Sequence, residues 1–278
     1  MALPSLRDDQ ESPPPPSSAY VALDNGACAS TDLTRGPWHP DHQHGGPPIA
    51  LVARSIERAA AALGLTHIAR LTANLLRPVP IAELAVEVET EYGGRNVAHF
   101  SARLHAGGKE VARCTAVAQR EHALDLPPGL PGHPLPQAPR SVEASPATRF
   151  PFSTTVKGYQ DLIESRIAEG AFFRGPSAVW FRMRYPLVAG EETSALQRVA
   201  VAADSGNGIS AILDFGSHSF VNPDLTINLL RKAQGEWICI DARTLLGPDG
   251  GGLAEARIFD VHGLIGRSTQ SLAIRLRE

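Results

Sequence analysis

Residues 71–77 read Leu-Thr-Ala-Asn-Leu-Leu-Arg, and residues 225–231 repeat them as Leu-Thr-Ile-Asn-Leu-Leu-Arg. Only the third position differs, and the two copies are 225 − 71 = 154 residues apart. The same shift, applied without a gap from position 71 to position 119, matches twelve identical residues. A repeat of this length corresponds to a whole folding unit, because solenoid repeats are much shorter. The sequence therefore predicts one small fold written twice.

Length and composition limit the class of protein. The 278 residues have room for two domains that each bury a core, and 43% hydrophobic with 20% charged residues is typical of a globular chain. A net charge of −3 gives no reason to expect nucleic acid or a membrane as partner, and the apolar runs are too short to span a bilayer. Three widely spaced cysteines and no basic-then-apolar leader favour the cytoplasm.

Changes in composition divide the chain into four parts. Residues 1–19 are expected to be a disordered or extended tail, and the proline-rich residues 123–149 an interdomain linker. In the units between, residues 20–122 and 150–278, apolar positions recur at helical spacing over 49–63 and about 192–213, and the stretch that follows each helix alternates with period two. A long central helix followed by an antiparallel sheet that wraps it is the hotdog pattern. We therefore expect an α+β chain, a tandem double hotdog whose halves pair side by side.

Several motifs follow one another along the two units in an order that can be compared with known families. His44-Gly45-Gly46 opens the first apolar helix, Asp204 lies inside the second, Asn222-Pro223-Asp224-Leu225-Thr226 leads into a strand, and Gln270 lies in the last strand. In order and spacing these motifs resemble the double-hotdog acyl-CoA thioesterases (the TesB-like, or acyl-CoA thioesterase II, family) over about residues 20–122 and 150–277. The resemblance implies hydrolysis of acyl-CoA to a free acid and CoA, with no cofactor beyond the CoA part of the substrate. Further assembly into a homo-oligomer is also expected.

The resemblance also suggests the catalytic residues, since in that family an Asp, a Ser or Thr and a Gln orient a water. Asp204 and Gln270 match two of these, and Asn222 stands where the hydroxyl is expected. Thr226 is the nearest hydroxyl on the same strand face, so Asn222 and Thr226 both remain candidates. Burial of Asp204 in its apolar segment would raise its pKa toward a value useful for a general base, although a polar surface end of the helix is the alternative. Ala116 takes the place of Gln270 in the first repeat.

His44, Gly45 and Gly46 are the predicted substrate-binding residues. Backbone N–H groups at the start of a helix favour negative charge, and glycine lets a carbonyl approach closely, so this segment would hold the oxyanion. A plain glycine-rich start of the helix is the alternative. His39, His42 and His44 lack a completing Cys or carboxylate pattern, so no metal is predicted.

Two other functions stay open because the expected hydroxyl is missing. One is a hotdog hydratase or dehydratase acting on enoyl or hydroxyacyl thioesters, whose sites typically use an Asp–His pair, with His218 as the nearest histidine in sequence. The other is a non-catalytic acyl-CoA-binding protein. The length of the acyl chain cannot be predicted, because its tunnel would be lined by residues from both halves.

Overall fold

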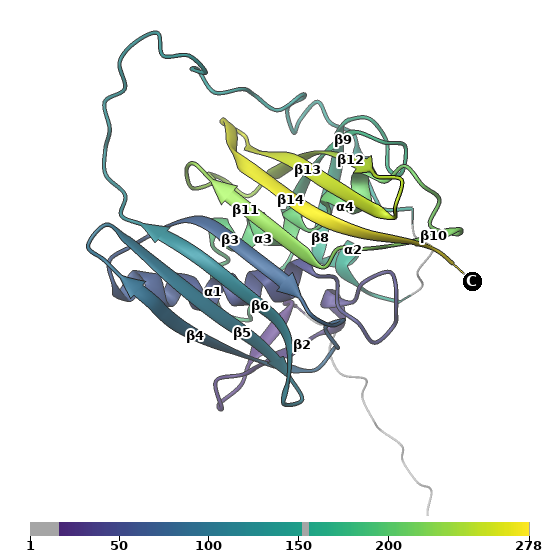
Figure 1. The fold of residues 1–278 in the computed structure, drawn as a ribbon, viewed down its shortest axis with the longest axis horizontal. Helices are drawn as coiled ribbons and strands as arrows, with labels where there is room; N and C mark the ends of the chain where they lie inside the picture. Colours follow the sequence, from purple (N-terminus) through teal and green to yellow (C-terminus); the bar gives the residue numbers. More distant parts are fainter. Residues whose placement is uncertain (1–16, 152–155, 278) are drawn as a thin grey trace, which may run out of the picture.

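An antiparallel sheet of 14 strands runs through the described part of the chain (Figure 1). The computed structural model describes residues 17–151 and 156–277, so most of the expected N-terminal tail lies outside the described residues. The strands follow the order β1-β2-β4-β5-β6-β3-β11-β14-β13-β12-β9-β8-β7, and β10 pairs with β14.

The first half contains two short strands, a long helix and a four-stranded meander. Its elements are β1 (Tyr20–Ala22), β2 (Cys28–Ser30), the 3-10 helix η1 (Asp32–Thr34), α1 (Gly46–Ala62), β3 (His67–Leu75), β4 (Glu83–Gly93), β5 (Val97–Ala106) and β6 (Lys109–Gln119). The second half has β7 (Ala147–Thr148), α2 (Tyr159–Leu162), β8 (Ile163–Glu169), β9 (Ser177–Met183), α3 (Ala195–Ala203), α4 (Gly206–Ser210), β10 (His218–Val221), β11 (Asp224–Leu229), β12 (Ile238–Leu246), β13 (Gly251–Asp260) and β14 (Gly263–Leu276).

The repeated heptapeptide lies at the centre of the sheet, where β3 pairs antiparallel with β11. Thr72 lies directly opposite its own repeat partner, Thr226. On either side the register is the same after the 154-residue shift: Ala102 faces Cys114, and Ala256 faces Ser268. The two halves of the sheet are therefore related by a pseudo-twofold axis between β3 and β11.

The helices cover one face of this sheet (Figure 1). The buried side of α1 consists of small and branched apolar residues from Ile49 to Ala60, and these belong to the same core cluster as the apolar residues of α3. α3 begins at a capping box. The Ser194 hydroxyl oxygen accepts the backbone N–H of Gln197, and the Gln197 side-chain oxygen accepts the backbone N–H of Ser194. The capping box fixes the N-terminal end of α3, whereas α1 begins at Gly45 without a side-chain cap.

The second central helix differs from the single helix expected over about 192–213. It is split into α3 and α4, with Asp204 and Ser205 between them. Gly206 lowers the helix propensity at the break. A second interruption separates β10 from β11 at Asn222-Pro223, because proline has no N–H group for the strand ladder. Both interruptions fall at residues that the sequence marked as candidates.

The proline-rich segment crosses the outside of the molecule and ends on the second half. The Trp180 indole N–H donates to the Arg140 carbonyl at 2.8 Å, and Val142 is buried with Trp180 and Phe259. Residues of this segment therefore pack on the second half before β7 begins. None of the helices in the described ranges is long and apolar enough to cross a membrane.

Candidate active site

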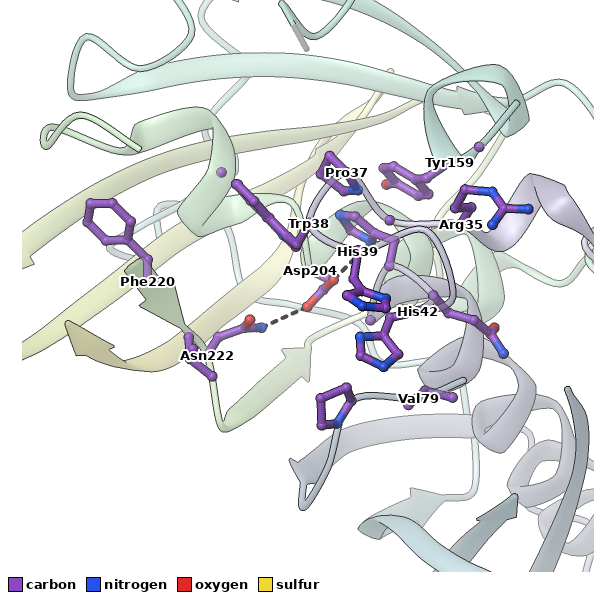
Figure 2. A pocket seen from close by; sticks show the side chains of 18 of the residues that line it. Arg35, Pro37, Trp38, His39, His42, Val79, Tyr159, Asp204, Phe220 and Asn222 are labelled. Atoms are coloured by element: carbon purple, nitrogen blue, oxygen red, sulfur yellow. Dashed lines mark hydrogen bonds and ion pairs between the residues drawn. The ribbon is translucent and has the colours of Figure 1, made fainter. Parts of the chain in front are cut away.

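Asp204 lies at the break between α3 and α4, where both halves of the chain meet. The residue is 9% exposed, so it is not the polar surface end of a helix that the sequence left open. Its backbone remains in the right-handed helical region (φ −63°, ψ −19°), which turns the side chain toward the start of α1. Figure 2 shows the carboxylate in the middle of the lining residues of a cavity.

Three predicted site residues contact this carboxylate. His44 Nδ1 is 3.0 Å from Oδ2, and Asn222 Nδ2 donates to Oδ1 at 2.8 Å. Gln270 Nε2 donates to the Asp204 carbonyl at 3.2 Å and lies 3.5 Å from Oδ1. His44 comes from the first half and the other residues from the second. The structure thus brings together an Asp–His pair from opposite halves of the chain.

The expected direction of the Asp204 pKa is wrong. Burial raises the pKa of this carboxyl, but the charge and hydrogen bond of His44, the Asn222 amide and the Gly46 N–H outweigh burial, and the pKa lies below its usual value. Donors that bond the charged form favour ionisation. The lowered pKa favours the ionised form of Asp204, and Nδ1 of His44 lies within hydrogen-bond distance of both Asp204 Oδ2, at 3.0 Å, and the Gly46 N–H, at 3.2 Å.

Gln270 holds the break between the two helices together. Its side chain is 2% exposed. While Nε2 donates to Asp204, Oε1 accepts the backbone N–H of Asn207 at 2.9 Å. Both ends of the amide are thus bonded to protein, so the amide positions Asp204 and the first turn of α4.

Thr226 is placed away from this cluster. Its hydroxyl donates to the hydroxyl of Thr72 at 3.2 Å, across the pseudo-twofold axis. The interruption at Asn222-Pro223 puts Asn222 ahead of β11 and beside Asp204, whereas Thr226 lies inside the ladder. Of the two alternatives for the missing hydroxyl, only Asn222 contacts Asp204.

The two glycines are needed for a close approach between the helices. A Cβ on Gly46 would lie 2.5 Å from the Val201 carbonyl oxygen of α3, and a Cβ on Gly45 would lie 2.9 Å from Asp204 Oδ2. The Gly46 N–H donates to His44 Nδ1 at 3.2 Å and also helps to lower the pKa of Asp204, and Pro47 and Pro48 have no N–H. The N–H of Gly45, which lines the cavity, has no acceptor among the described residues. Gly45 is thus the N–H donor available at the start of α1.

Tyr159 and Ser205 support the Asp–His pair, and the sequence did not single them out. The Tyr159 ring stacks on the His44 ring with centroids 3.7 Å apart and planes at 4°. Its hydroxyl donates to the Val201 carbonyl at 2.8 Å and lies 3.0 Å from Ser205 Oγ, so the serine proton points to Tyr159. Burial raises the pKa of the Tyr159 phenol. Ser205 is therefore a poor nucleophile, although it follows Asp204 directly.

A cavity of about 780 Å³ opens in front of these residues. Its lining combines the polar cluster with aromatic rings, of which Trp38 and Phe215 are 4.9 Å apart and Phe215 and Phe220 are 5.1 Å apart. Three arginines, Arg35, Arg77 and Arg277, also line it. His218 does not, since its ring lies beside Ser217. Among the described residues no group of three His, Cys, Asp or Glu side chains could hold a metal ion.

The apolar walls and the polar cluster at a helix start form a pocket of the kind that binds a small-molecule substrate. The acyl-CoA thioesterase N-terminal domain matches residues 34–119, and the acyl-CoA thioesterase C-terminal domain matches residues 135–274. The chain therefore belongs to the acyl-CoA thioesterase family. No curated protein matches the chain in sequence.

Solved structures share the fold at low sequence identity. A candidate thioesterase from Novosphingobium aromaticivorans is 21% identical with a TM-score of 0.67, covering 92% of this chain and 98% of its own. A hot dog fold protein from Alicyclobacillus acidocaldarius is 14% identical with a TM-score of 0.69 (94% and 98%). An acyl-CoA thioesterase II, TesB2, from Mycobacterium marinum is 17% identical with a TM-score of 0.64 (93% and 96%). These similarities confirm the hotdog fold.

Proposed function

We propose that this chain is a double hotdog, with halves at residues 20–122 and 150–278, that hydrolyses acyl-CoA thioesters at one composite site. The observation that carries the proposal is the contact between His44 of the first half and Asp204 of the second, at the wall of the cavity. The pseudo-twofold axis relates the sheets but not the sites, because Ala116 stands where the second half has Gln270.

The proton acceptor in this mechanism is His44. An ionised carboxylate has about four acceptor positions. Those of Asp204 face the donors of His44, Asn222 and Gly46, with Gln270 at 3.5 Å. The remaining nitrogen, Nε2 of His44, has no partner among the described residues. The role expected for Asp204 thus passes to a dyad, in which Asp204 orients the imidazole and stabilises its protonated form.

Hydrolysis then follows in two balanced steps. Water attacks the thioester carbonyl carbon while Nε2 of His44 takes one of its protons, and the Gly45 N–H donates to the developing oxyanion. The tetrahedral intermediate collapses by breaking the carbon–sulfur bond. The CoA thiolate leaves and takes up the proton from His44, which regenerates the neutral imidazole. No covalent intermediate on the protein is needed.

The cavity suits an acyl-CoA substrate at both ends. Trp38, Phe215 and Phe220 offer an apolar surface for the acyl group. Arg35 is paired with Asp32, whereas Arg77 and Arg277 form no ion pair among the described residues and carry positive charge that suits the phosphates of CoA. The homo-oligomeric state and the cytoplasmic location stay predictions.

Release of free thiol from a series of acyl-CoAs tests the proposal. Wild-type protein should release CoA from some acyl-CoA of the series, and His44→Ala should abolish that release. Arg103→Ala, on the exposed outer face of β5, is the matched control and should keep the wild-type rate. Thiol release that His44→Ala leaves intact would contradict the dyad.

The same dyad favours one second candidate, a hydratase or dehydratase of enoyl thioesters. The expected Asp–His pair is present, although with His44 in place of His218. Loss of enoyl absorbance without thiol release would support hydration instead of hydrolysis. Membership of a hydrolase family leaves no support for the non-catalytic binding protein.

A further inference from the structure

The short strand β10 has unpaired backbone groups at the wall of the cavity. Arg277 donates its backbone N–H to the Ser217 carbonyl at 2.9 Å, and opposite residues on antiparallel strands alternate between bonded and unbonded pairs. Phe220 lies opposite Ile274 and therefore belongs to an unbonded pair. Ile274 donates its N–H to the Gly250 carbonyl instead, on the other side of β14. The N–H and C=O of Phe220 thus point away from β14 and have no partner among the described residues. These two groups are the free edge of β10.

The end of β3 leaves the place beside this edge open. The N–H of Leu75, the last residue of β3, still donates to the Pro223 carbonyl at 2.7 Å. The N–H groups of Leu76 and Arg77 both turn to the Val111 carbonyl of β6, at 3.0 and 3.2 Å. β3 therefore leaves the sheet before it could pair with the free edge, and the residues on both sides of the gap line the cavity. An unpaired strand edge next to such a gap can bind an extended ligand as an added strand.

The free edge lies at a suitable distance from the dyad. β10 and β11 pair with β14 in registers that differ by one residue, so a β-bulge at residues 222–223 separates them. Asn222 in this bulge contacts Asp204, and Phe220 comes two residues earlier (Figure 2). Two residues of a strand span about 7 Å. In an acyl-CoA, five bonds join the thioester carbon to the β-alanyl carbonyl carbon, about 6 Å in an extended chain. A thioester at Asp204 therefore places its β-alanyl group beside the free edge.

Positive charge lies further along the same edge. His218 also faces this edge, but its N–H donates to the Asp214 carbonyl at 2.9 Å and its C=O accepts Arg277 Nε at 3.2 Å. The Arg277 guanidinium, which has no ion pair among the described residues, thus lies beyond Phe220 as seen from the dyad. The Phe220 ring leaves the edge uncovered, because side chains stand perpendicular to a sheet whereas N–H and C=O groups lie in its plane.

We infer that the free edge of β10 binds the pantetheine arm of CoA as a short added strand. The β-alanyl group carries one N–H and one C=O, as an amino-acid residue does, with one additional methylene. Rotation about its methylene–methylene bond lets both groups face one edge. Its C=O accepts the Phe220 N–H, its N–H donates to the Phe220 C=O, and the phosphates follow at Arg277. This inference rests on the proposed hydrolysis and adds the backbone groups that recognise the leaving thiol.

Two substitutions at one position separate the backbone N–H from the ring. Phe220→Ala removes the ring and keeps the N–H, whereas Phe220→Pro removes both. Proline is tolerated in an edge strand where the N–H points away from the ladder. The substrates are an acyl-CoA that wild type hydrolyses and the same acyl thioester of N-acetylcysteamine and of pentanethiol, in which methylene groups replace the amide. Enzyme-free hydrolysis corrects for the leaving groups, and thermal unfolding checks that each variant folds.

The expected result depends on the amide of the substrate. Because one hydrogen bond is lost, kcat/KM of Phe220→Pro should lie about tenfold below that of Phe220→Ala with acyl-CoA and with the N-acetylcysteamine ester. The two variants should agree with the pentanethiol ester. A ratio between the variants that is the same for all three esters would show a structural effect and overturn the inference. If Phe220→Pro does not fold, wild type decides, since equal corrected kcat/KM for the two small esters overturns the inference and a preference of about tenfold for the amide supports it.

Arg277→Ala tests the direction of the arm. This variant should raise KM for acyl-CoA about tenfold and leave KM for the N-acetylcysteamine ester, which has no phosphate, unchanged. An unchanged KM for acyl-CoA would show that the arm leaves by another route and overturn the inference. Absence of thiol release from every acyl-CoA by wild type would instead remove the proposed function itself, together with this inference.

Discussion

Asp204→Asn separates the charge of Asp204 from its shape, because the amide has nearly the same volume. In the proposed mechanism the carboxylate stabilises the imidazolium that forms when His44 accepts a proton. His44 Nδ1 and Asp204 Oδ2 are 3.0 Å apart. At that distance a unit charge pair contributes about 5 kcal/mol if the effective dielectric constant is about 20. Since about 1.4 kcal/mol is a factor of ten in rate, the variant should lose about three to four orders of magnitude in kcat.

The assay is the release of CoA thiol at saturating acyl-CoA, measured for wild type, Asp204→Asn, His44→Ala and the double variant. Because the two residues act as one unit, the double variant should be no slower than the slower single variant. Thermal unfolding checks that each variant remains folded. Activity of folded Asp204→Asn within about tenfold of wild type would refute the dyad, as would fully multiplicative losses in the double variant.

Four further predictions test other parts of the site. Because the pKa of Asp204 is lowered, its ionised form contributes stability above the unfolded-state pKa of 3.8, and this contribution is lost as pH falls through the folded-state pKa. Urea unfolding should therefore show that acid destabilises wild type more than Asp204→Asn. Equal losses of stability in the two proteins would contradict this prediction. Asn222→Val should lower kcat about tenfold, whereas Thr226→Val should change kcat less than about twofold. Similar losses of kcat in the two variants would show that Thr226 also acts in the site. Gly46→Ala, whose Cβ would meet a backbone oxygen of α3 at 2.5 Å, should cost about 1–3 kcal/mol, and an unchanged Tm would disprove the close helix approach. Trp38→Ala should shift the ratio of kcat/KM between bulky and short acyl-CoAs by about tenfold, and a constant ratio would place the acyl group elsewhere.

Much of the fold is readable from the repeat and from periodicity. The 154-residue shift that aligns the two heptapeptides also aligns the strand registers, because a strand's pairing is set by which residues face the core. The position of α1 follows from apolar residues at helical spacing. The break at Asp204 was not predicted, since one helix was expected over about 192–213, although the polar residues 204–208 and their two glycines weaken a helix there.

The site was readable only in part. Asp204, Gln270 and Asn222 were identified through the order of their motifs, and the structure places them in one hydrogen-bonded cluster. Tyr159 gave no pattern, because it belongs to a helix of only four residues.

The sequence by itself determined the duplication, the helix-then-meander order of each half and the family, because these depend on local periodicity and on motifs that lie along the chain. The tertiary structure alone decided that His44 meets Asp204 from the opposite half, that this contact lowers the pKa of a buried carboxyl, and that Thr226 lies away from the site. Side chains more than a hundred residues apart carry no local pattern that records their distance. A pKa and a proton path depend on which donors surround a group after packing, and that is a property of the folded chain.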